Sequence, residues 1–480
     1  MRIFVSNPSY GENFVRSARW AARSRGRVQR HPDYLLIAVA VLEQKGHEVK
    51  FLDSAALNID LESTIKAAAE FHPDLAVIHT TTPSIYNDVQ HAELFKDLGL
   101  ITVLIGQHAS ALPEETIRLS EKIDYIIRGE YDFTLAEIAD RKDPATIDGI
   151  TYRDGNAIRS TKNRRYIENL DSLPLPAWHH IDIHDYFDAG KMFPFITLIT
   201  GRGCPNSCSF CVLPQVMYGK KYRLRSAKNV VDEIESDLNQ FPDIKEVMFE
   251  DDALTVDIER CKEICREIIA RGINKKICWS GNSRADIDDE ELFSLMKESG
   301  CRMLVVGFEF GDEQILKNVH KRVTTDQMRK FIRLTKKAGI NVHGCFMIGG
   351  PGDTSASAQK TIQLARELKP DTLQFSALTP YPGTEFYDWC KKNNYITAKD
   401  WPEWVDAGEQ STVVSYPDFT REAIVKTVDT ALYDNFYFRP EIWIHHLVTI
   451  RSVGDLKRKM QGAKSLVGYW WARRKRKKSD

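Results

Sequence analysis

The stretch Gly201-Arg-Gly-Cys-Pro-Asn-Ser-Cys-Ser-Phe-Cys211 decides the fold of this chain, because its three cysteines are spaced CxxxCxxC. Three thiolates on one short loop can ligate three irons of a [4Fe–4S] cluster and leave the fourth iron open to a small ligand. The alternatives are a disulfide pair and a zinc site, which would need a fourth cysteine or histidine close by, and none follows. The apolar run Phe193–Thr200 predicts a strand that ends at the loop, and such ends form the catalytic face of α/β barrels. We therefore expect Cys204, Cys208 and Cys211 to be the cluster ligands.

The composition is that of an ordinary globular protein. The chain has 480 residues, of which 42% are hydrophobic and 28% charged, and this length allows two or three domains. Its net charge of -1 gives no general attraction to nucleic acid or to a membrane. The run Met1–Pro8 predicts a strand rather than a leader, and no run reaches the ~18 apolar residues of a membrane span. The odd number of cysteines, nine, fits a reducing compartment, so we expect a cytoplasmic protein.

The cysteine loop resembles that of the radical S-adenosylmethionine (SAM) superfamily, in which an aromatic residue, here Phe210, usually precedes the third cysteine. The resemblance implies that the open iron binds the amino and carboxylate groups of SAM. One electron then cleaves the sulfonium and releases a 5′-deoxyadenosyl radical, which implies an external one-electron donor of the flavodoxin or ferredoxin type. Six strand-like runs separated by helical runs between residues 193 and 385 suit the partial (β/α)6 barrel of this superfamily.

Polar residues follow the second and third predicted strands of this barrel. Glu250 and Asp251 end the second strand, where their carboxylates can accept charge-assisted hydrogen bonds from the ammonium group of SAM. The alternative is an acid pair that stabilises a helix N-terminus. After the third strand, Arg284 can pair with the carboxylate of SAM and Asn282 can reach its ribose.

The fourth and fifth strands end in motifs that resemble those of the superfamily. Glu309 occupies the position of the glutamate in the GxES motif, with Phe310 in place of the serine. Ile348-Gly-Gly-Pro-Gly-Asp-Thr354 resembles the adenine motif GxPGET, and its glycines let the backbone lie against a flat base. The SAM-binding residues that the resemblance implies are therefore Phe210, Glu250, Asp251, Asn282, Arg284, Glu309, Gly350 and Gly352.

The first third of the chain predicts a separate α/β unit over residues 1–140. Five strand-like runs alternate with helical runs, which is typical of a doubly wound, Rossmann-like parallel sheet that binds ligands at the carboxyl ends of its strands. The unit resembles the cobalamin (B12)-binding domain that precedes many radical SAM domains. Gly106-Gln-His-Ala-Ser-Ala-Leu-Pro-Glu-Glu115 resembles the GGxHxxxxPEE turn of that domain. The residues predicted to bind cobalamin at the strand ends are Ser9, Thr81, Thr82, Gly106, His108, Gly129 and Glu130.

The DxHxxG motif, which supplies an axial histidine to cobalt in many B12 proteins, is absent from this unit. His79 and His108 do not lie in that pattern. Members of the family often bind cobalamin without a histidine ligand, and some keep the fold without the cofactor, so both alternatives stay open. His108 is either a cofactor contact or a loop histidine that is satisfied by backbone hydrogen bonds.

Three further segments complete the predicted domain order. Residues 141–190 form a linker with a β-hairpin, for which Asp154-Gly155 is the turn signal. The barrel follows over residues 191–400, and residues 401–480 form a helical C-terminal region with a basic tail. Within the linker, Trp178-His-His-Ile-Asp-Ile-His184 has a metal-like composition. Adjacent histidines point in different directions in most backbones, so we expect a plain loop there.

The C-terminal tail combines aromatic and basic residues. Residues 451–480 hold eleven lysines and arginines against two aspartates, and Trp470 and Trp471 precede the cationic end. This composition suits peripheral contact with the anionic inner face of a membrane. A solvated tail behind a packed helix and a nucleic-acid contact are the alternatives. RNA-modifying radical SAM enzymes carry extra cysteines upstream and a C-terminal β-barrel, and neither is visible, so we expect no nucleic-acid partner.

Over nearly its whole length the chain resembles the subgroup of the anaerobic magnesium-protoporphyrin IX monomethyl ester cyclase and the hopanoid-biosynthesis radical SAM enzyme. The resemblance implies an enzyme that modifies an unactivated carbon of a large or lipid-like small molecule. Methylation, cyclisation and rearrangement all stay open. The alternatives are an RNA-modifying radical SAM enzyme and a non-catalytic redox or cobalamin sensor. A sensor would normally carry a DNA-binding or signalling domain, and none is visible.

Overall fold

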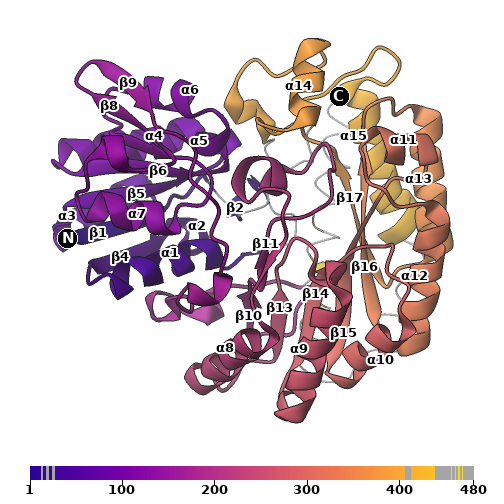
Figure 1. Ribbon diagram of the computed structural model, residues 1–480. Coiled ribbons are helices and arrows are strands. Elements are labelled where there is room, and N and C mark those ends of the chain that lie inside the picture. Colours follow the sequence, from indigo (N-terminus) through magenta and orange to yellow (C-terminus); the bar gives the residue numbers. More distant parts are fainter. Residues whose placement is uncertain are drawn as a thin grey trace.

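The computed structural model describes residues 1–11, 14–17, 21–23, 28–405 and 412–437, together with residues 456, 460, 463, 464 and 468. Two large sheets with helices around them follow one another along the chain, the first mostly parallel and the second wholly parallel (Figure 1). The N-terminal unit, at the left of Figure 1, packs beside the larger unit that carries the cysteine loop.

The strands of the first sheet are β1 (Arg2–Asn7), β4 (Glu48–Asp53), β5 (Leu75–Thr80), β6 (Ile101–Gly106), β7 (Tyr125–Ile127), β8 (Ile150–Asp154) and β9 (Ala157–Ser160). Their order in the sheet is β4-β1-β5-β6-β7-β8-β9. The first five strands are parallel, and their order is the flavodoxin-like form of the doubly wound fold. The predicted Rossmann-like unit is therefore confirmed.

Helices cover both faces of the first sheet because successive side chains of its strands point to opposite sides. On β1, Ile3 and Val5 join one apolar cluster with the helix after residue 32, and Phe4 joins a second cluster with the helix after residue 84. The helices of this unit are α1 (Asp33–Gln44), α2 (Ser54–Leu57), α3 (Leu61–Phe71), α4 (Ile85–Asp97), α5 (Gln107–Ala111), α6 (Pro113–Arg118) and α7 (Asp132–Ala139).

The hairpin β8–β9 extends the first sheet, although the sequence places it in a linker. Tyr125 of β7 pairs with Tyr152 of β8 in an antiparallel register, and β9 pairs with β8. The physical reason is the free edge of β7, whose backbone groups would otherwise lack partners. The hairpin therefore closes the first unit before the chain continues to the second.

The second sheet contains β10 (Phe195–Leu198), β13 (Glu246–Phe249), β14 (Cys278–Ser283), β15 (Cys301–Glu309), β16 (Asn341–Ile348) and β17 (Thr372–Ala377). These six strands are parallel and lie in chain order, which confirms the predicted (β/α)6 arrangement. Leu304, Val306 and Phe308 of β15 pack into the apolar core, so Val305 and Gly307 point to the other side of the sheet. The helices of this unit are α8 (Ala227–Gln240), α9 (Ile258–Ala270), α10 (Glu290–Glu298), α11 (Glu313–Asn318), α12 (Thr325–Ala338) and α13 (Ser355–Leu368).

Two short antiparallel pairs lie outside the large sheets. One joins β2 (Phe14–Arg16) to β3 (Ala21–Arg23), and the other joins β11 (Gly201–Arg202) to β12 (Arg223–Leu224). The second pair brackets the cysteine loop, since it joins the residues just before the first cysteine to a segment about ten residues after the third. It therefore closes the base of the loop.

The C-terminal region begins with α14 (Glu385–Lys392) and the short turn η9 (Trp401–Trp404). It continues with α15 (Arg421–Asp429), which runs into a π-helical stretch, η10 (Thr430–Tyr437). Residues 421–437 of the predicted helical C-terminal region are thus helical. The basic tail, with Trp470 and Trp471, lies outside the described residues apart from a few single positions. Within the described ranges, no helix combines the length and the apolar character that crossing a membrane requires.

Candidate active site

The cysteine loop follows β11 and is held by backbone hydrogen bonds at its centre. The amide of Ser209 donates to the carbonyl of Val319 at 3.0 Å, and the carbonyl of Ser209 accepts from the amide of Phe386 at 2.9 Å. Cys204, Cys208 and Cys211 are half-buried, and no disulfide joins any of the nine cysteines, all of which lie in the described ranges. The fold therefore presents three thiols on one fixed loop.

Gln215 holds this loop in place through hydrogen bonds, a role that the sequence did not predict. Its Nε2 lies 3.1 Å from the carbonyl oxygen of Cys208, 3.1 Å from that of Ser209 and 2.9 Å from that of Cys211. Its Oε1 accepts from the amide of Glu385 at 2.9 Å. Gln215 lies in a π-helical turn, a feature often found at functional sites. The one signal in the sequence is a single amide side chain within the otherwise apolar run 212–217.

Glu309 ends β15 in a strained turn. Its φ is +66°, and the amide of Phe310 donates to the carbonyl of Phe308 at 3.0 Å across it. The Oε1 atom of Glu309 accepts from Lys321 Nζ at 2.8 Å, whereas its Oε2 atom is buried without a hydrogen-bond partner. A buried acceptor without a partner is costly unless a ligand satisfies it. Among the described residues, this oxygen is therefore a buried acceptor that a ligand in the barrel could satisfy.

Lys321 is the second residue that sequence reasoning missed, because its neighbours His320 and Arg322 make the run look like a solvated surface. The ammonium group is buried, with 7% of the residue exposed. Burial raises the pKa of the Cys208 thiol, and the charge of Lys321 acts in the opposite direction. Lys321 thus lies close enough to both Cys208 and Glu309 to act on them electrostatically.

Two glycines make room at the ends of β15 and β16. A Cβ atom on Gly307 would lie 2.2 Å from Glu309 Oε1 and 3.0 Å from Lys321 Nζ, so a side chain there would displace this ion pair. A Cβ atom on Gly350 would lie 2.8 Å from Cζ of Phe310. Phe310, which replaces the serine of the family motif, therefore packs beneath the glycine loop instead of offering a hydroxyl.

Asp251 and Asn282 hold the start of the cysteine loop. Asp251 Oδ1 accepts from the amides of Thr200 at 2.5 Å and Gly201 at 3.1 Å, and Oδ2 accepts from the Thr200 hydroxyl. Asn282 Nδ2 in turn donates to the carbonyl of Asp251 at 2.9 Å. Since this carboxylate already has three donors, the structure gives it a supporting role, and its predicted contact with SAM stays a prediction.

The other residues predicted for SAM lie around this core. Arg284 Nη2 donates to Asp286 Oδ2 at 2.7 Å, so its guanidinium is held by a neighbouring carboxylate. Glu250 lines a small hollow together with Tyr34 and Thr197. Gly352 lies in the same loop as Gly350, and Phe210 packs at the edge of the apolar core. Their contacts with SAM stay predictions.

A buried ion-pair cluster joins the two units at the base of the cysteine loop. Arg202 of β11 pairs with Asp132 of α7 at 2.6 and 3.0 Å and lies 3.4 Å from Glu130. Arg223 of β12 donates to both oxygens of Glu130 at 2.8 and 2.9 Å. No side chain of the four is more than 3% exposed. The sequence placed Glu130 at the cobalamin site, whereas the structure directs its carboxylate at the two arginines.

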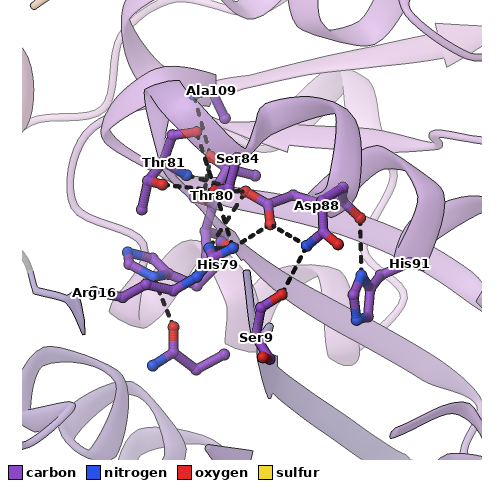
Figure 2. Close-up of polar contacts among 12 residues, drawn as sticks. Ser9, Arg16, His79, Thr80, Thr81, Ser84, Asp88, His91 and Ala109 are labelled. Carbon is purple, nitrogen blue, oxygen red and sulfur yellow. Dashed lines mark hydrogen bonds and ion pairs between the residues drawn. The ribbon is translucent and has the colours of Figure 1, made fainter. Parts of the chain in front are cut away.

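The carboxyl edge of the first sheet contains a second buried ion pair, between Arg16 of β2 and Asp88 of α4 (Figure 2). Arg16 also donates to Ser84 Oγ and to the carbonyl of His79, both at 2.9 Å. Thr81 belongs to the same network, since its amide donates to Asp88 Oδ2 at 3.1 Å. The predicted cofactor residue Thr81 is therefore engaged within the protein.

His108 faces the end of the barrel unit. Its Nδ1 lies 3.3 Å from the hydroxyl of Thr82, and the ring meets that of Trp401 edge-on at 5.0 Å. Burial lowers the pKa of His108 to about 3, so the ring is neutral at physiological pH, and its Nε2 is buried without a partner. The alternative of a loop histidine satisfied by backbone hydrogen bonds is therefore wrong, because no backbone group among the described residues bonds this ring.

The packing of the first sheet itself requires a glycine at position 106. Its φ is +109°, and a Cβ atom would lie 2.6 Å from the carbonyl oxygen of Thr80, so the close approach of β5 and β6 excludes a side chain. The amide of Gly129 donates a hydrogen bond to Ser110 Oγ at 3.0 Å. Ser9 accepts a hydrogen bond through its carbonyl from Asn87 at 3.0 Å, so its hydroxyl is not used in that contact.

A polar chain that the sequence did not predict runs along the ends of β4, β1 and β5. Tyr186 donates to Asp53 Oδ2 at 2.9 Å, and Asn7 donates to Asp53 Oδ1 at 2.8 Å. Asn7 Oδ1 lies 3.1 Å from His79 Nδ1. Burial raises the pKa of Asp53 to about 6 and lowers that of His79 to about 3. The chain ties the linker residue Tyr186 to the crevice where doubly wound sheets bind ligands.

The histidine-rich stretch of the linker behaves differently from its prediction. His179 Nε2 and His180 Nε2 converge on one oxygen of Glu43, at 3.0 and 2.8 Å, instead of diverging. A short 3-10 turn anchored by the buried Trp178 brings the two rings to 4.4 Å from each other. Each ring has an acceptor in Glu43, so hydrogen bonding to the last turn of α1 accounts for this stretch.

Two family models match the chain. The Radical SAM superfamily model matches residues 198–365, and the B12 binding domain model matches residues 29–139. A protein named as an uncharacterized methyltransferase of Pyrococcus horikoshii is 30% identical over 439 residues, which are 89% of this chain and 94% of that relative. The chain belongs to the B12-binding radical SAM enzymes. The models imply a [4Fe–4S] cluster, SAM and cobalamin as the cofactors of this radical SAM enzyme, in agreement with the sequence predictions.

Two further relatives and one solved structure are similar to this B12-binding radical SAM enzyme. The anaerobic magnesium-protoporphyrin IX monomethyl ester cyclase of Cereibacter sphaeroides is 27% identical over 85% of this chain and 68% of the relative. The hopanoid C-3 methylase of Methylococcus capsulatus is 25% identical over 89% of this chain and 79% of the relative. The solved structure of the radical SAM methyltransferase TsrM of Kitasatospora setae, with cobalamin and a [4Fe–4S] cluster bound, has a TM-score of 0.71 at 16% identity. It covers 97% of this chain and 99% of that chain, which shows a shared fold.

The residues of the radical SAM enzyme fit these cofactors. The three half-buried thiols of the loop are the donor set that an iron–sulfur cluster takes, and Glu309 Oε2 offers a buried acceptor beside it. At the edge of the first sheet, His108 Nε2 and Ser6 Oγ are buried polar atoms without a hydrogen-bond partner. Both observations point to polar ligands at these two places.

Proposed function

We propose that this radical SAM enzyme is a methyltransferase that uses cobalamin and methylates an unactivated carbon of a large, apolar, lipid-like or tetrapyrrole-like small molecule. The observation that carries the proposal is the buried ion pair between Arg202 and Asp132. It holds the base of the cysteine loop against the helix that follows the last parallel strand of the B12-type sheet. Methyl transfer needs both cofactor sites at one substrate, whereas cyclisation needs only the radical. The relatives named as methylases and as an ester cyclase support the substrate class.

When bound, the cluster supplies the electron that cleaves SAM. The residues of the chain bind and position the cofactors. Cys204, Cys208 and Cys211 hold the cluster, and the Gln215 amide keeps the carbonyls of their loop in place. Glu309 Oε2 accepts a hydrogen bond from the ammonium group or a ribose hydroxyl of SAM, and Lys321 holds that carboxylate in position.

The remaining predicted SAM contacts fit the same proposal. Arg284 is placed to exchange its partner Asp286 for the carboxylate of SAM, and Glu250 adds an acceptor at the end of β13. The backbone of Gly350 and Gly352 is the predicted surface for the adenine. On the first unit, Thr82 and His108 face the barrel unit, and the ion-pair networks leave their side chains available for cobalamin. The Ser9 hydroxyl and the Gly129 backbone complete the proposed contacts.

Lys321→Met should weaken the binding of SAM without removing the cluster. The variant leaves Glu309 buried without its cation, and the loss of such a charged hydrogen bond costs about 1.5–3 kcal/mol, which is roughly a tenfold or larger rise in the dissociation constant for SAM. Equilibrium binding of SAM to reconstituted protein measures this rise, and iron analysis checks the cluster. Lys321→Arg should restore part of the affinity, and Lys317→Met, an exposed neighbour, should have no effect. Equal SAM affinity in Lys321→Met and the unmodified protein would contradict the role of Lys321.

The proposed function itself is tested with SAM that carries a trideuterated methyl group. Reconstituted protein is incubated with hydroxocobalamin and desalted, and we expect near-stoichiometric retention of corrinoid. With a reductant and an extract of apolar metabolites, we then expect a product heavier by one trideuteromethyl group, together with 5′-deoxyadenosine. A ring-closed product without the label would favour cyclisation. Deoxyadenosine formation without any retained corrinoid would rule out methyl transfer.

Two partners belong to the proposal as well. Cleavage of SAM consumes an electron, so an external one-electron donor of the flavodoxin or ferredoxin type is required. Peripheral contact with an anionic membrane is proposed from the composition of residues 451–480, since the basic residues there are the kind that such surfaces attract.

A further inference from the structure

A depression of about 550 Å³ lies on the surface beside the cysteine loop. One wall is Ser207, which lies between the first and second cysteines, and the other is α11 with the segment 319–324 that follows it. Lys317, His320 and Arg322 are exposed along this wall. The depression therefore lies beside the cysteine loop at Ser207, the residue before Cys208, and none of the SAM contacts proposed above lines it.

Along the segment 319–323, buried and exposed side chains alternate. Val319, Lys321 and Val323 are buried, whereas His320 and Arg322 are exposed. The φ angles of His320 and Arg322 are +56° and +53°, a left-handed conformation that non-glycine residues seldom adopt. This strained conformation turns Lys321 inward to Glu309 and turns its two basic neighbours outward to the depression.

The two carboxylates that line the depression, Glu313 and Glu385, each have a partner. Glu313 Oε1 accepts from the amide of Thr325 at 2.8 Å, and Glu385 Oε2 lies 3.4 Å from His320 Nδ1. In the part of the chain that the structure describes, Lys317 and Arg322 form no ion pair. The face beside the cluster loop therefore offers two unpaired cations to a partner.

A short hydrogen-bonded route leads from this wall to a cluster ligand. The carbonyl of Val319 accepts from the amide of Ser209 at 3.0 Å, and Ser209 is bonded to Cys208. On the other side of the wall, Val319 is bonded to His320, which is exposed. A molecule seated in the depression is thus one hydrogen bond and a few covalent bonds away from a thiolate of the cluster.

We propose that this depression is the docking surface of an acidic one-electron carrier protein, which contacts Lys317 and Arg322 and reduces the cluster through the segment 319–322. The proposal rests on the proposed function, because only reductive cleavage of SAM requires such a carrier. The carrier is oxidised by one electron, and that electron is consumed when one carbon–sulfur bond of SAM breaks. Opposite charge guides such encounters and makes their rate dependent on salt.

The test compares two ways of reducing the same protein. The double variant Lys317→Glu/Arg322→Glu should raise the concentration of reduced flavodoxin needed for half-maximal SAM cleavage at least tenfold at low salt, and added salt should shrink the difference. With dithionite, a small reductant that needs no docking surface, the rate should equal that of the unmodified protein. The control Lys66→Glu/Arg333→Glu carries the same change of net charge at exposed positions far from the loop in sequence, and it should behave like the unmodified protein.

Each result separates the docking surface from the proposed function. Equal flavodoxin dependence in the double variant and the control would overturn the docking surface while leaving the enzyme's activity intact. Failure of both flavodoxin and a ferredoxin to reduce unmodified protein that dithionite does activate would overturn it as well. If the unmodified protein does not cleave SAM even with dithionite, that result would instead contradict the proposed function. Reduced iron content in the double variant alone would also count against the proposal, because it would assign these residues to the cluster site.

Discussion

Replacing Cys204, Cys208 and Cys211 together with alanine should abolish both the cluster and the cleavage of SAM. The three thiols are the only cluster donors that the loop offers, and each thiolate is a direct ligand to iron. Anaerobically reconstituted protein should hold about four irons per chain, and the triple variant should hold close to none. Iron analysis, the visible absorbance of the cluster and the yield of 5′-deoxyadenosine measure the three losses.

The control for this result is the triple replacement of Cys261, Cys265 and Cys301 with serine or alanine. These cysteines are fully buried within the apolar core, away from the loop. We expect this control to keep its iron even where it loses stability. Iron and SAM cleavage retained in the loop variant would refute the assignment of the cluster.

Asp132→Ala should lower the free energy of unfolding by about 3–5 kcal/mol, because removing one partner of a buried pair leaves the other charge uncompensated. The partner is Arg202, whose side chain is 2% exposed, and in the described part of the chain Glu130, at 3.4 Å, is the carboxylate that remains paired with it. Because Arg202 directly precedes the cysteine loop, the variant should also uncouple the two units. We expect the variant to continue to cleave SAM while the yield of methylated product decreases.

Glu168→Ala is the matched control for this prediction. Glu168 pairs with Lys221 at 2.5 Å between similar parts of the chain, but the two side chains are 70% and 69% exposed. Solvent screens exposed pairs, so they contribute little to stability, and urea unfolding should show a small change in this variant. Similar losses in both variants would mean that burial does not decide the value of the Arg202–Asp132 pair.

The sequence predicted those parts of the molecule that depend on local patterns. The strands and helices of both units follow from β-rich apolar runs that alternate with helical runs, and the three cysteines follow from their spacing. It also predicted that Glu309 and Gly350 would lie at strand ends, since each belongs to a short motif. What these residues contact stays a prediction that the SAM-binding experiment above can test.

The rest could not be predicted because it depends on contacts between distant parts of the chain. Gln215 and Lys321 carry no motif, and each acquires its role only when the barrel brings it to the cysteine loop. Glu130 lies at the end of a strand that suits cofactor binding, and only the tertiary structure reveals Arg223 as its partner. His179 and His180 converge because the buried Trp178 fixes the turn that contains them. A rule that considers only adjacent residues cannot predict this turn.

The clamp made by Gln215 has a consequence for the order in which the protein matures. The loop is held by the amides of Glu385 and Phe386, which lie about 170 residues further along the chain and beyond the sixth barrel strand. During synthesis, the ribosome therefore releases the three cysteines long before the groups that fix their loop exist. The cysteine loop can reach its final shape only after the last strand has left the ribosome, so iron delivery to a rigid site belongs to the completed chain. Until then the thiols are exposed to oxidation, and the cell must keep them reduced for the whole of that interval.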